Sequence, residues 1–577
     1  MAELSISWAT RMNIMDIKKL TLHALPLIAI GAVSACGTES KNAEECNEGC
    51  FADAGSADAA GDTRSITVEA LGDGEAVLIV NGEACELPCT QAMPLNAEVR
   101  LEVQPTLTTS FGEWDRGECA RELVCEFTVT QDATLAFSLA VAGEPLSQFA
   151  APDYVGVRGA VIDSVGNFYL TGSTQRKRVF ASSSLPGNGE VYEYIIKVSP
   201  DGTPLWVREF NETDDGMRGT SLVEGLLALS PDESSLYVAA RDVLVPGFGD
   251  NFIDHMRLFE VDAATGEDGW HRDIRSYNRS IEPRHLAVGT TGNVHLAGKA
   301  SENLGAGGVV IETHGSRDSF LISYTGDGEL LSGSARNSVG AEDVDIVDGF
   351  DLVPDGSGGV YNVNRYIADP FGDRDLQYKI AHFDSSGSLL SEVDTFENVQ
   401  GIAPTANGGL VIAGFYRDEE TAEDLGLPLP EGVDIFLAEV DTEGTPRWIR
   451  AIGGARSEAP FGVEVGRDSN IRLTAEVREK GVSDFGNGPL PVIGERDYVT
   501  ATFSSTGELR WAQVFNIGDD PIYPLITVAA LDKVFVIGNF FDQMVGPFGI
   551  LDAPPHPDTA QGLFNRRGSP YIISYRE

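Results

Sequence analysis

Basic residues are scarce in this chain compared with acidic ones. It carries 41 Lys and Arg against 88 Asp and Glu, which gives a formal net charge of −47 over 577 residues. Such a surface repels phosphate backbones and anionic headgroups, so nucleic acid is excluded as an expected partner. The acidity suits solubility, cations or basic partners, and a solvated surface is its simplest explanation.

Motifs that bring catalytic groups together are also missing from the long C-terminal part of the chain. After residue 150 there is no Walker loop, no H-E-x-x-H, no G-x-S-x-G and no cysteine. The run "DGSGG" at residues 355–359 lacks the lysine and the following helix of a phosphate loop, and it is typical of a hairpin turn. These absences favour binding or scaffolding over catalysis.

Glycine and proline, by contrast, are plentiful, at 64 and 28 residues. This composition favours many short strands and turns over long helices. With 577 residues and 42% hydrophobic content, the chain is too long for one ordinary core and too apolar for wholesale disorder. We therefore expect an all-β chain with several domains or one large repeat array.

The N-terminus has the layout of a secretory signal peptide, over residues 1–35. Lys18 and Lys19 precede the apolar run "LTLHALPLIAIGAVSAC", which ends in small residues at Cys36. The run is too short and too interrupted for a stable membrane span. Its end, "VSAC", resembles the lipobox of bacterial lipoproteins, which implies cleavage before Cys36 and acylation of that residue. An ordinary signal peptide with an incidental cysteine is the alternative.

Residues 36–62 are small and acidic, so they are expected to form a flexible tether. The residue after Cys36 is Gly37 rather than Asp. By resemblance to the sorting of Gram-negative lipoproteins, this implies the outer membrane, with the chain in the periplasm or on the cell surface.

Six further cysteines are all near the tether: Cys46, Cys50, Cys85, Cys89, Cys119 and Cys125. An even count in an exported segment predicts disulfides, and the C-x3-C spacing is not one that zinc sites prefer. Neighbouring cysteines are expected to pair locally. Cross-pairing between the second and third neighbouring pairs is the rival arrangement.

Residues 63–142 predict one small disulfide-bonded β-domain. Alternation in "VRLEV" and "FTVT" indicates short strands. The order of a Cys pair, "VRLEVQP", "FGEW", a second Cys pair and "FTVTQDATL" resembles the divergent internalin-type B-repeat domain of bacterial surface proteins. That resemblance implies a spacer or adhesive module without chemistry of its own.

Residues 143–577 repeat one phrase, in which a strand, a tight turn and a second strand follow one another. Clear copies are "YIIKVSPDGTPLW", "FLAEVDTEGTPRW" and "VTATFSSTGELRW". Equivalent apolar residues lie 57 to 72 residues apart, at Val198, Val261, Tyr324, Phe383, Val440, Phe503 and Tyr575. Seven copies of about four strands predict a seven-bladed β-propeller.

The copies resemble the SBBP-type bacterial propeller repeat, most clearly in "FGNGPLPVIGERDYVTATFSSTGELRW". Tryptophans that recur after the turn, such as Trp206 and Trp448, indicate packing rather than a cofactor site. The seventh copy stops one strand short at Glu577. We expect residues 145–150, "PLSQFA", to supply that outer strand and close the ring.

A break in the repeat marks the candidate binding site. The position that opens each innermost strand holds Gly159, Gly225, His285, Asp351, Gly401, Gly462 and Leu525. His285 and Asp351 interrupt the glycines in adjacent copies, and Arg158 and Arg284 stand beside the same position. We expect these four residues at the mouth of the central channel. Drift of a degenerate repeat is the competing explanation.

The sequence thus predicts a monomeric cell-envelope lipoprotein whose propeller binds a protein or glycan, or acts as a scaffold, without catalysis. The alternative is a propeller lyase or hydrolase that acts on a glycan through His285 and nearby acids. No cofactor is expected. The run "EDVDIVDGFD" at residues 342–351 approaches calcium-loop spacing but lacks the alternating ligands and the distal Glu, so a solvated loop is preferred.

Overall fold

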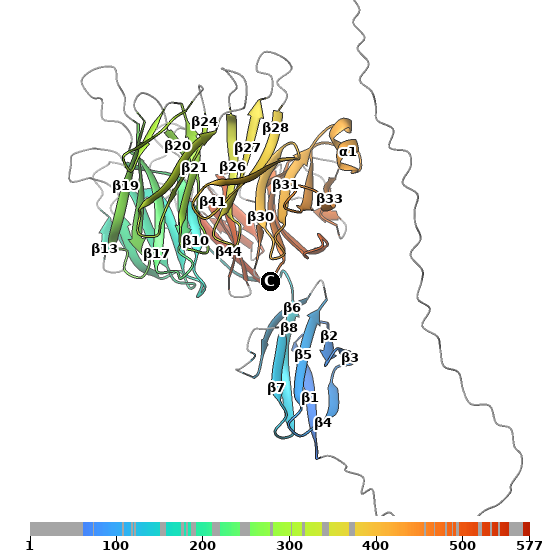
Figure 1. Ribbon diagram of the computed structural model, residues 1–577. Helices are drawn as coiled ribbons and strands as arrows, with labels where there is room; N and C mark the ends of the chain where they lie inside the picture. The colour runs from blue at the N-terminus through green and yellow to red at the C-terminus, as the bar shows by residue number, and fades with distance from the viewer. Residues whose placement is uncertain are drawn as a thin grey trace, which may run out of the picture. The chain divides into compact units, whose positions relative to one another are not determined.

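The computed structural model describes residues 62–577 with gaps, and the regular secondary structure of the described part is β-strand apart from one short helix (Figure 1). The gaps lie at residues 73, 107–108, 117–118, 120–122, 151–156, 175–177, 181–182, 186–191, 210–219, 243–253, 277–280, 302, 314–317, 337–345, 368–375, 455–456, 467, 479–481, 487–488, 492–495, 517–521, 531–532, 541–542, 548, 553–568 and 577. The predicted signal peptide and residues 36–61 of the predicted tether, with Cys36, Cys46 and Cys50, fall outside the described residues. The α-helix of the described part is α1, Glu419–Leu425, and no helix there is long and apolar enough to cross a membrane.

The N-terminal domain consists of two four-stranded sheets, with strand orders β4-β1-β8-β6 and β3-β2-β5-β7. Its strands are β1 Thr63–Gly72, β2 Ala76–Val80, β3 Glu83–Cys85, β4 Cys89–Pro94, β5 Glu98–Pro105, β6 Thr109–Trp114, β7 Val124–Thr128 and β8 Ala133–Val141. Alternating apolar residues of both sheets, among them Val68, Leu101 and Phe137, form one shared core.

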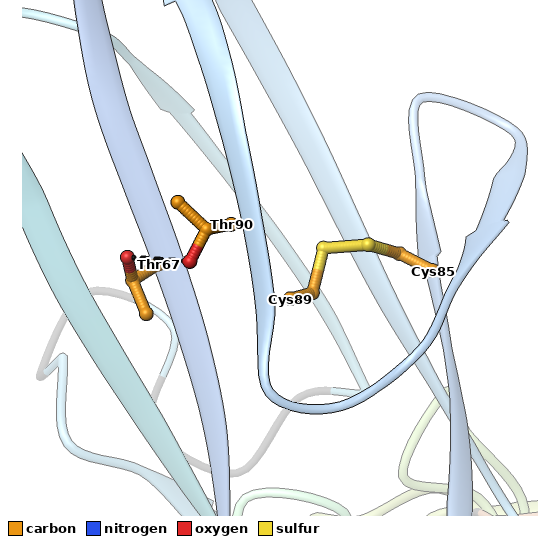
Figure 2. The surroundings of a disulfide bond; sticks show 4 residues. All are labelled: Thr67, Cys85, Cys89 and Thr90. Carbon is orange, nitrogen blue, oxygen red and sulfur yellow. Dashed lines mark hydrogen bonds between the residues drawn. A yellow bond between two sulfur atoms is a disulfide. The ribbon is translucent and has the colours of Figure 1, made fainter.

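Two disulfides hold this domain together. Cys85 ends β3 and Cys89 begins β4, so the bond between them ties one sheet to the other, with the two Cα atoms 5.8 Å apart (Figure 2). The second bond joins Cys119 to Cys125 in β7. Both bonds link sequence neighbours, so the local pairing is the one present and the cross-paired alternative is wrong.

Seven further sheets, named I to VII, follow in chain order. Their strand orders are I β10-β11-β14-β15, II β16-β17-β18-β19-β22-β23, III β20-β21-β24-β25, IV β26-β27-β28-β29, V β30-β31-β32-β33-β36-β37, VI β34-β35-β38-β39 and VII β40-β41-β44-β9. The hairpins β12-β13 and β42-β43 form separate two-stranded sheets.

The strand bounds in sheets I to III and in the first hairpin are β10 Val157–Ile162, β11 Phe168–Thr174, β12 Arg178–Phe180, β13 Ser183–Leu185, β14 Tyr192–Val198, β15 Pro204–Glu209, β16 Thr220–Leu229, β17 Ser235–Asp242, β18 Asp254–Asp262, β19 Asp268–Ser276, β20 Ile281–Val288, β21 Val294–Ala300, β22 Leu304–Ala306, β23 Val309–Ile311, β24 Asp318–Tyr324 and β25 Leu330–Arg336. The remaining strands are β26 Ile346–Pro354, β27 Val360–Ile367, β28 Leu376–Phe383, β29 Leu389–Thr395, β30 Val399–Pro404, β31 Leu410–Tyr416, β32 Asp434–Val440, β33 Pro446–Gly454, β34 Ser457–Val465, β35 Ile471–Arg478, β36 Val482–Asp484, β37 Pro489–Pro491, β38 Arg496–Phe503, β39 Leu509–Phe515, β40 Ile522–Ala530, β41 Lys533–Phe540, β42 Gln543–Gly546, β43 Gly549–Asp552, β44 Ser569–Arg576 and β9 Pro145–Ala150.

The seven sheets lie in a propeller-like arrangement. The first strand of each sheet contacts the first strand of the next, from β10 through β16, β20, β26, β30 and β34 to β40, and β40 contacts β10 again. Inner strands are buried on both faces, as β21, β24 and β32 show at every residue. A strand buried on both faces needs a neighbouring layer on each side, so the sheets pack face to face.

Sheet VII takes its outermost strand from the segment that precedes sheet I. Strand β9 pairs antiparallel with β44, and the register places Phe149 opposite Ile572. This is the pairing that the sequence analysis expects for residues 145–150.

The residues just before β9 also complete the turn that follows the third strand of sheet VII, where the chain itself is interrupted. In sheet V the turn after the third strand is closed by the Gly444 N–H, which donates to the Asp441 carbonyl across 3.0 Å. In sheet VII the Gly143 N–H donates to the Arg576 carbonyl across 2.8 Å, and the Arg576 N–H donates to the Glu144 carbonyl across 2.8 Å. Gly143 and Gly444 have φ angles of 76° and 80°, which favour glycine. Two separate chain segments thus form the repeated turn.

Short hairpins from one repeat cover the outer edge of the sheet before it. Strands β22 and β23 form a hairpin that lies in the sequence between β21 and β24 of sheet III. In the structure, β22 pairs with β19 of sheet II. Likewise β36 and β37 form a hairpin that lies in the sequence between β35 and β38 of sheet VI, and β36 pairs with β33 of sheet V. Such pairing protects edge strands that would otherwise expose backbone donors and acceptors. These hairpins were not predicted from the sequence.

Candidate functional site

A β-bulge in the first strands shapes the candidate site. The register of β10 with β11 shifts at Arg158, and the register of β20 with β21 shifts at Arg284. Equivalent shifts occur in β26, β30 and β34. The residues that follow these bulges are those compared in the repeat: Gly159, His285, Asp351, Gly401 and Gly462. Because a bulge re-aims the side chains around it, this position differs from the rest of the strand.

The structure brings His285 and Asp351 together from neighbouring sheets. His285 lies on β20 of sheet III, and Asp351 lies on β26 of sheet IV. The distance from His285 Nδ1 to Asp351 Oδ1 is 4.0 Å, and 24% and 27% of the two side chains are exposed. The pair is therefore partly open to solvent and able to touch a ligand.

The Asp351 carboxylate is held on both oxygens by backbone amides. The Leu352 N–H donates to Oδ1 across 2.9 Å, and the Ile402 N–H donates to Oδ2 across 3.0 Å. Ile402 belongs to β30, so this side chain links sheet IV to sheet V. Burial raises the pKa of Asp351 above its ordinary value, while His285 and the two amides oppose the rise.

The two arginines expected beside this pair lie on β10 and β20. Arg284 Nη2 lies 2.8 Å from Glu282 Oε2 on its own strand, β20. Arg158 lies on β10, and sheet II separates that strand from β20 in the succession of first strands. Because their contact links neighbouring sheets, His285 and Asp351 form the centre of the candidate site.

The described residues offer no cluster of three or more His, Cys, Asp or Glu side chains placed to hold a metal ion. Residues 342–345 of the acidic run lie outside the described part. Asp351 ends that run, and both of its oxygens accept amide hydrogens.

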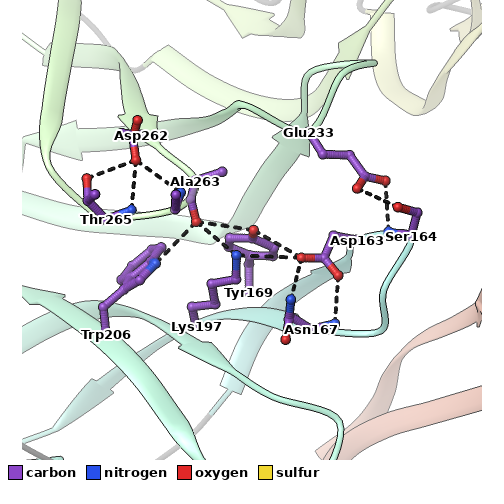
Figure 3. A network of polar contacts seen from close by, with 11 residues as sticks. Asp163, Ser164, Asn167, Tyr169, Lys197, Trp206, Glu233, Asp262, Ala263 and Thr265 are labelled. Carbon is purple, nitrogen blue, oxygen red and sulfur yellow. Dashed lines mark hydrogen bonds and ion pairs between the residues drawn. The ribbon is translucent and has the colours of Figure 1, made fainter.

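A second polar cluster lies between sheets I and II (Figure 3). The Ala263 carbonyl, in a turn of sheet II, accepts hydrogen bonds from Trp206 Nε1 at 3.2 Å, Tyr169 Oη at 3.2 Å and Lys197 Nζ at 3.1 Å. Lys197 Nζ also lies 3.6 Å from Asp163 Oδ2. Burial and the neighbouring Asp163 raise the pKa of Tyr169, so its hydroxyl remains a donor.

The same arrangement recurs between sheets II and III, which identifies its role. There the Gly326 carbonyl accepts from Trp270 Nε1 at 2.8 Å and from Tyr237 Oη at 3.3 Å. Contacts that repeat at equivalent positions hold neighbouring sheets together. The recurring tryptophans therefore serve packing between sheets.

No family model matches the chain, and no curated protein matches it either. Solved structures similar to it are β-propeller proteins. The β-propeller domain of the Trilobed protease from Pyrococcus furiosus is 8% identical, and the match covers 72% of this chain and 100% of that one with a TM-score of 0.37. The periplasmic gluconolactonase of Pseudomonas aeruginosa is 13% identical, with 75% and 99% covered and a TM-score of 0.35. A Synechocystis apocarotenoid oxygenase is 11% identical, with 71% and 92% covered and a TM-score of 0.32. These similarities concern the fold alone.

Proposed function

We propose that this chain is a cell-envelope lipoprotein whose seven sheets are the blades of a closed propeller that binds a ligand without catalysis. The observation that carries the proposal is the way Asp351 is held. Its two oxygens accept amides from strands of two sheets, and His285 lies beside it with part of its ring exposed. A preorganised polar pair of this kind suits recognition of a protein or glycan. Catalysis by proton transfer would instead need a carboxylate oxygen that can reach the substrate, whereas both oxygens of Asp351 accept backbone amides.

The proposed membrane anchoring concerns the N-terminal part of the chain. The lipobox-like "VSAC" supports acylation at Cys36, and Gly37 supports transfer to the outer membrane. Disulfides in the N-terminal domain suit an oxidising compartment. That domain, similar in its sequence features to B-repeat modules, would hold the SBBP-type propeller away from the membrane as a spacer. No cofactor takes part in this function.

Cys36→Ser should abolish lipid attachment. Cells that express the full chain and are fed a fatty-acid analogue should label the wild-type protein and the Cys46→Ser variant equally. The Cys36→Ser variant should carry no label and should leave the membrane fraction. Equal labelling of the wild type and Cys36→Ser would remove the anchoring proposal, and recovery in the inner membrane would remove the outer-membrane assignment.

Ligand capture should depend on His285. A fragment of residues 63–577 would be screened on glycan and protein arrays, with and without calcium. His285→Ala should weaken binding of the captured ligand at least about tenfold, since one charge-assisted hydrogen bond contributes about 1.5–3 kcal/mol. His271→Ala, at an exposed residue of β19, is the matched control and should bind like the wild type. Unchanged affinity in His285→Ala would rule out this site.

A glycan lyase or hydrolase is the second candidate function. It is favoured by the 4.0 Å approach of His285 Nδ1 to Asp351 Oδ1, because two titratable side chains at a partly exposed position can act as a general acid and base. Cleavage of a captured glycan that disappears in Asp351→Asn, while the variant still binds, would support the enzyme over the binding protein.

A further inference from the structure

Two buried carboxyl groups, Asp434 and Glu458, lie side by side between sheets V and VI. Just before them, Val433 and Ser457 form a parallel β-bridge, and the Glu458 N–H donates to the Val433 carbonyl across 2.7 Å. Since successive side chains alternate along a strand, Asp434 and Glu458 project to the same side of this bridge. The two acids therefore face one another across the seam.

Neither acid is fully satisfied by the protein around it. Asp434 is 8% exposed and Glu458 is 0% exposed. Asp434 Oδ1 and Glu458 Oε2 are buried without a hydrogen-bond partner, whereas Glu458 Oε1 accepts from the Ser483 hydroxyl of β36. Packing is tight, because a Cβ atom on Gly453 would lie 2.5 Å from Asp434 Cγ. Unpaired carboxylates are strongly unfavourable in such a site.

The charged groups around the pair do not offset its charge. Desolvation raises the pKa of Asp434 to about 6, and nearby Glu431 adds to the rise while the Tyr416 hydroxyl opposes it. Desolvation also raises the pKa of Glu458 to about 7, where Asp434 adds to the rise while Ser483 and backbone amides oppose it. The charges that act on the pair within the described residues are thus negative.

We propose that Asp434 and Glu458 form a buried proton-binding site that locks sheets V and VI together when it is protonated. A protonated carboxyl can donate to its neighbour, which gives the unpartnered oxygens a hydrogen bond. Loss of the protons leaves two like charges in a buried seam and weakens it.

The direction of the pH dependence follows from linkage. Both pKa values lie higher in the folded chain than the ordinary values of 3.8 for Asp434 and 4.5 for Glu458. Between the ordinary and the raised pKa of each group, the folded chain therefore binds more protons than the unfolded chain. The stabilisation is therefore complete below about pH 4 and is lost as the pH rises through about 7.

The hairpin β36-β37 is the element that this site would release. It carries Ser483, and it pairs with β33 through Gly453 with Asp484 and Gly454 with Ser483. Because the hairpin covers the outer edge of sheet V, ionisation of the pair would favour exposure of that edge. The external pH would then control access to an edge strand.

Hydrogen exchange on the full chain tests the proposal. The amides of residues 453, 454, 457, 458 and 482–484, corrected for intrinsic exchange, should lose protection between about pH 5 and pH 8. The expected loss is about tenfold for each pH unit over which one carboxyl must ionise. In the Asp434→Asn, Glu458→Gln variant these amides should keep the same protection at both pH values. The Val157 N–H, which donates to Asn539 Oδ1 across 2.9 Å at the seam between sheets VII and I, is the internal control.

Three results would overturn the proposal. One is unchanged protection at the V–VI seam in the wild type, and another is the same loss in the double variant. The third is a change in protection at constant pH when calcium is added or chelated, which would mean that the pair binds a cation. Should the double variant not fold, Glu458→Gln alone carries the test, because its amide oxygen can still accept from Ser483.

Discussion

A fragment that begins at Val155 is expected to be less stable by several kcal/mol than one that begins at Gly143. The shorter fragment loses strand β9 and the rebuilt turn, at about one kcal/mol per lost backbone hydrogen bond. It also leaves β44 as an uncovered edge although Tyr571, Ile573 and Tyr575 are buried there. Thermal unfolding followed by circular dichroism measures the difference.

The two fragments should also differ in association. An open edge strand with apolar side chains pairs readily with a second chain, so the shorter fragment should aggregate while the longer one stays monomeric in size-exclusion chromatography. Equal melting temperatures and equal elution of the two fragments would show that β9 does not close sheet VII in solution.

Phe436→Ala is expected to destabilise the fold by about 3–5 kcal/mol, the usual cost of truncating a buried aromatic residue. Phe436 is 0% exposed in sheet V. Its ring covers Gly414 on the neighbouring strand, where a Cβ atom would lie 2.4 Å from the ring, and it meets Phe396 at 5.4 Å between ring centroids. Urea unfolding of both proteins measures the change.

Leu429→Ala serves as the matched control for this substitution. Leu429 is 61% exposed, so its truncation should change the free energy of unfolding by less than about 0.5 kcal/mol. Equal effects of Phe436→Ala and Leu429→Ala would contradict the packing described for sheet V.

The sequence predicted those parts of the fold that depend on local chemistry. The turn in "DTEGTPRW" needs a glycine with positive φ, and Gly444 has φ 80°. Cysteines four and six residues apart, such as Cys85 with Cys89, could be paired because the closed loops are short. His285 and Asp351 could be placed together because equivalent repeat positions in adjacent sheets are neighbours.

Other features depend on contacts between distant segments and left no local pattern. The Ile402 amide donates to Asp351 from the next sheet, so the sequence around Asp351 does not predict this hydrogen bond. The bulges at Arg158 and Arg284 are offsets in pairing, which composition does not reveal. The burial of Glu458 follows from packing of β34 against sheet V, and a lone Glu in the sequence suggests a solvated residue.

The fate of the captured ligand tests the proposed binding role most directly. The ligand found on the arrays would be incubated with the wild-type fragment of residues 63–577 and then analysed by mass spectrometry, in parallel with His285→Ala. The proposal predicts a ligand of unchanged mass, held by the wild type and largely lost from His285→Ala. Cleavage or other turnover of the ligand by the wild type, abolished in His285→Ala, would contradict it.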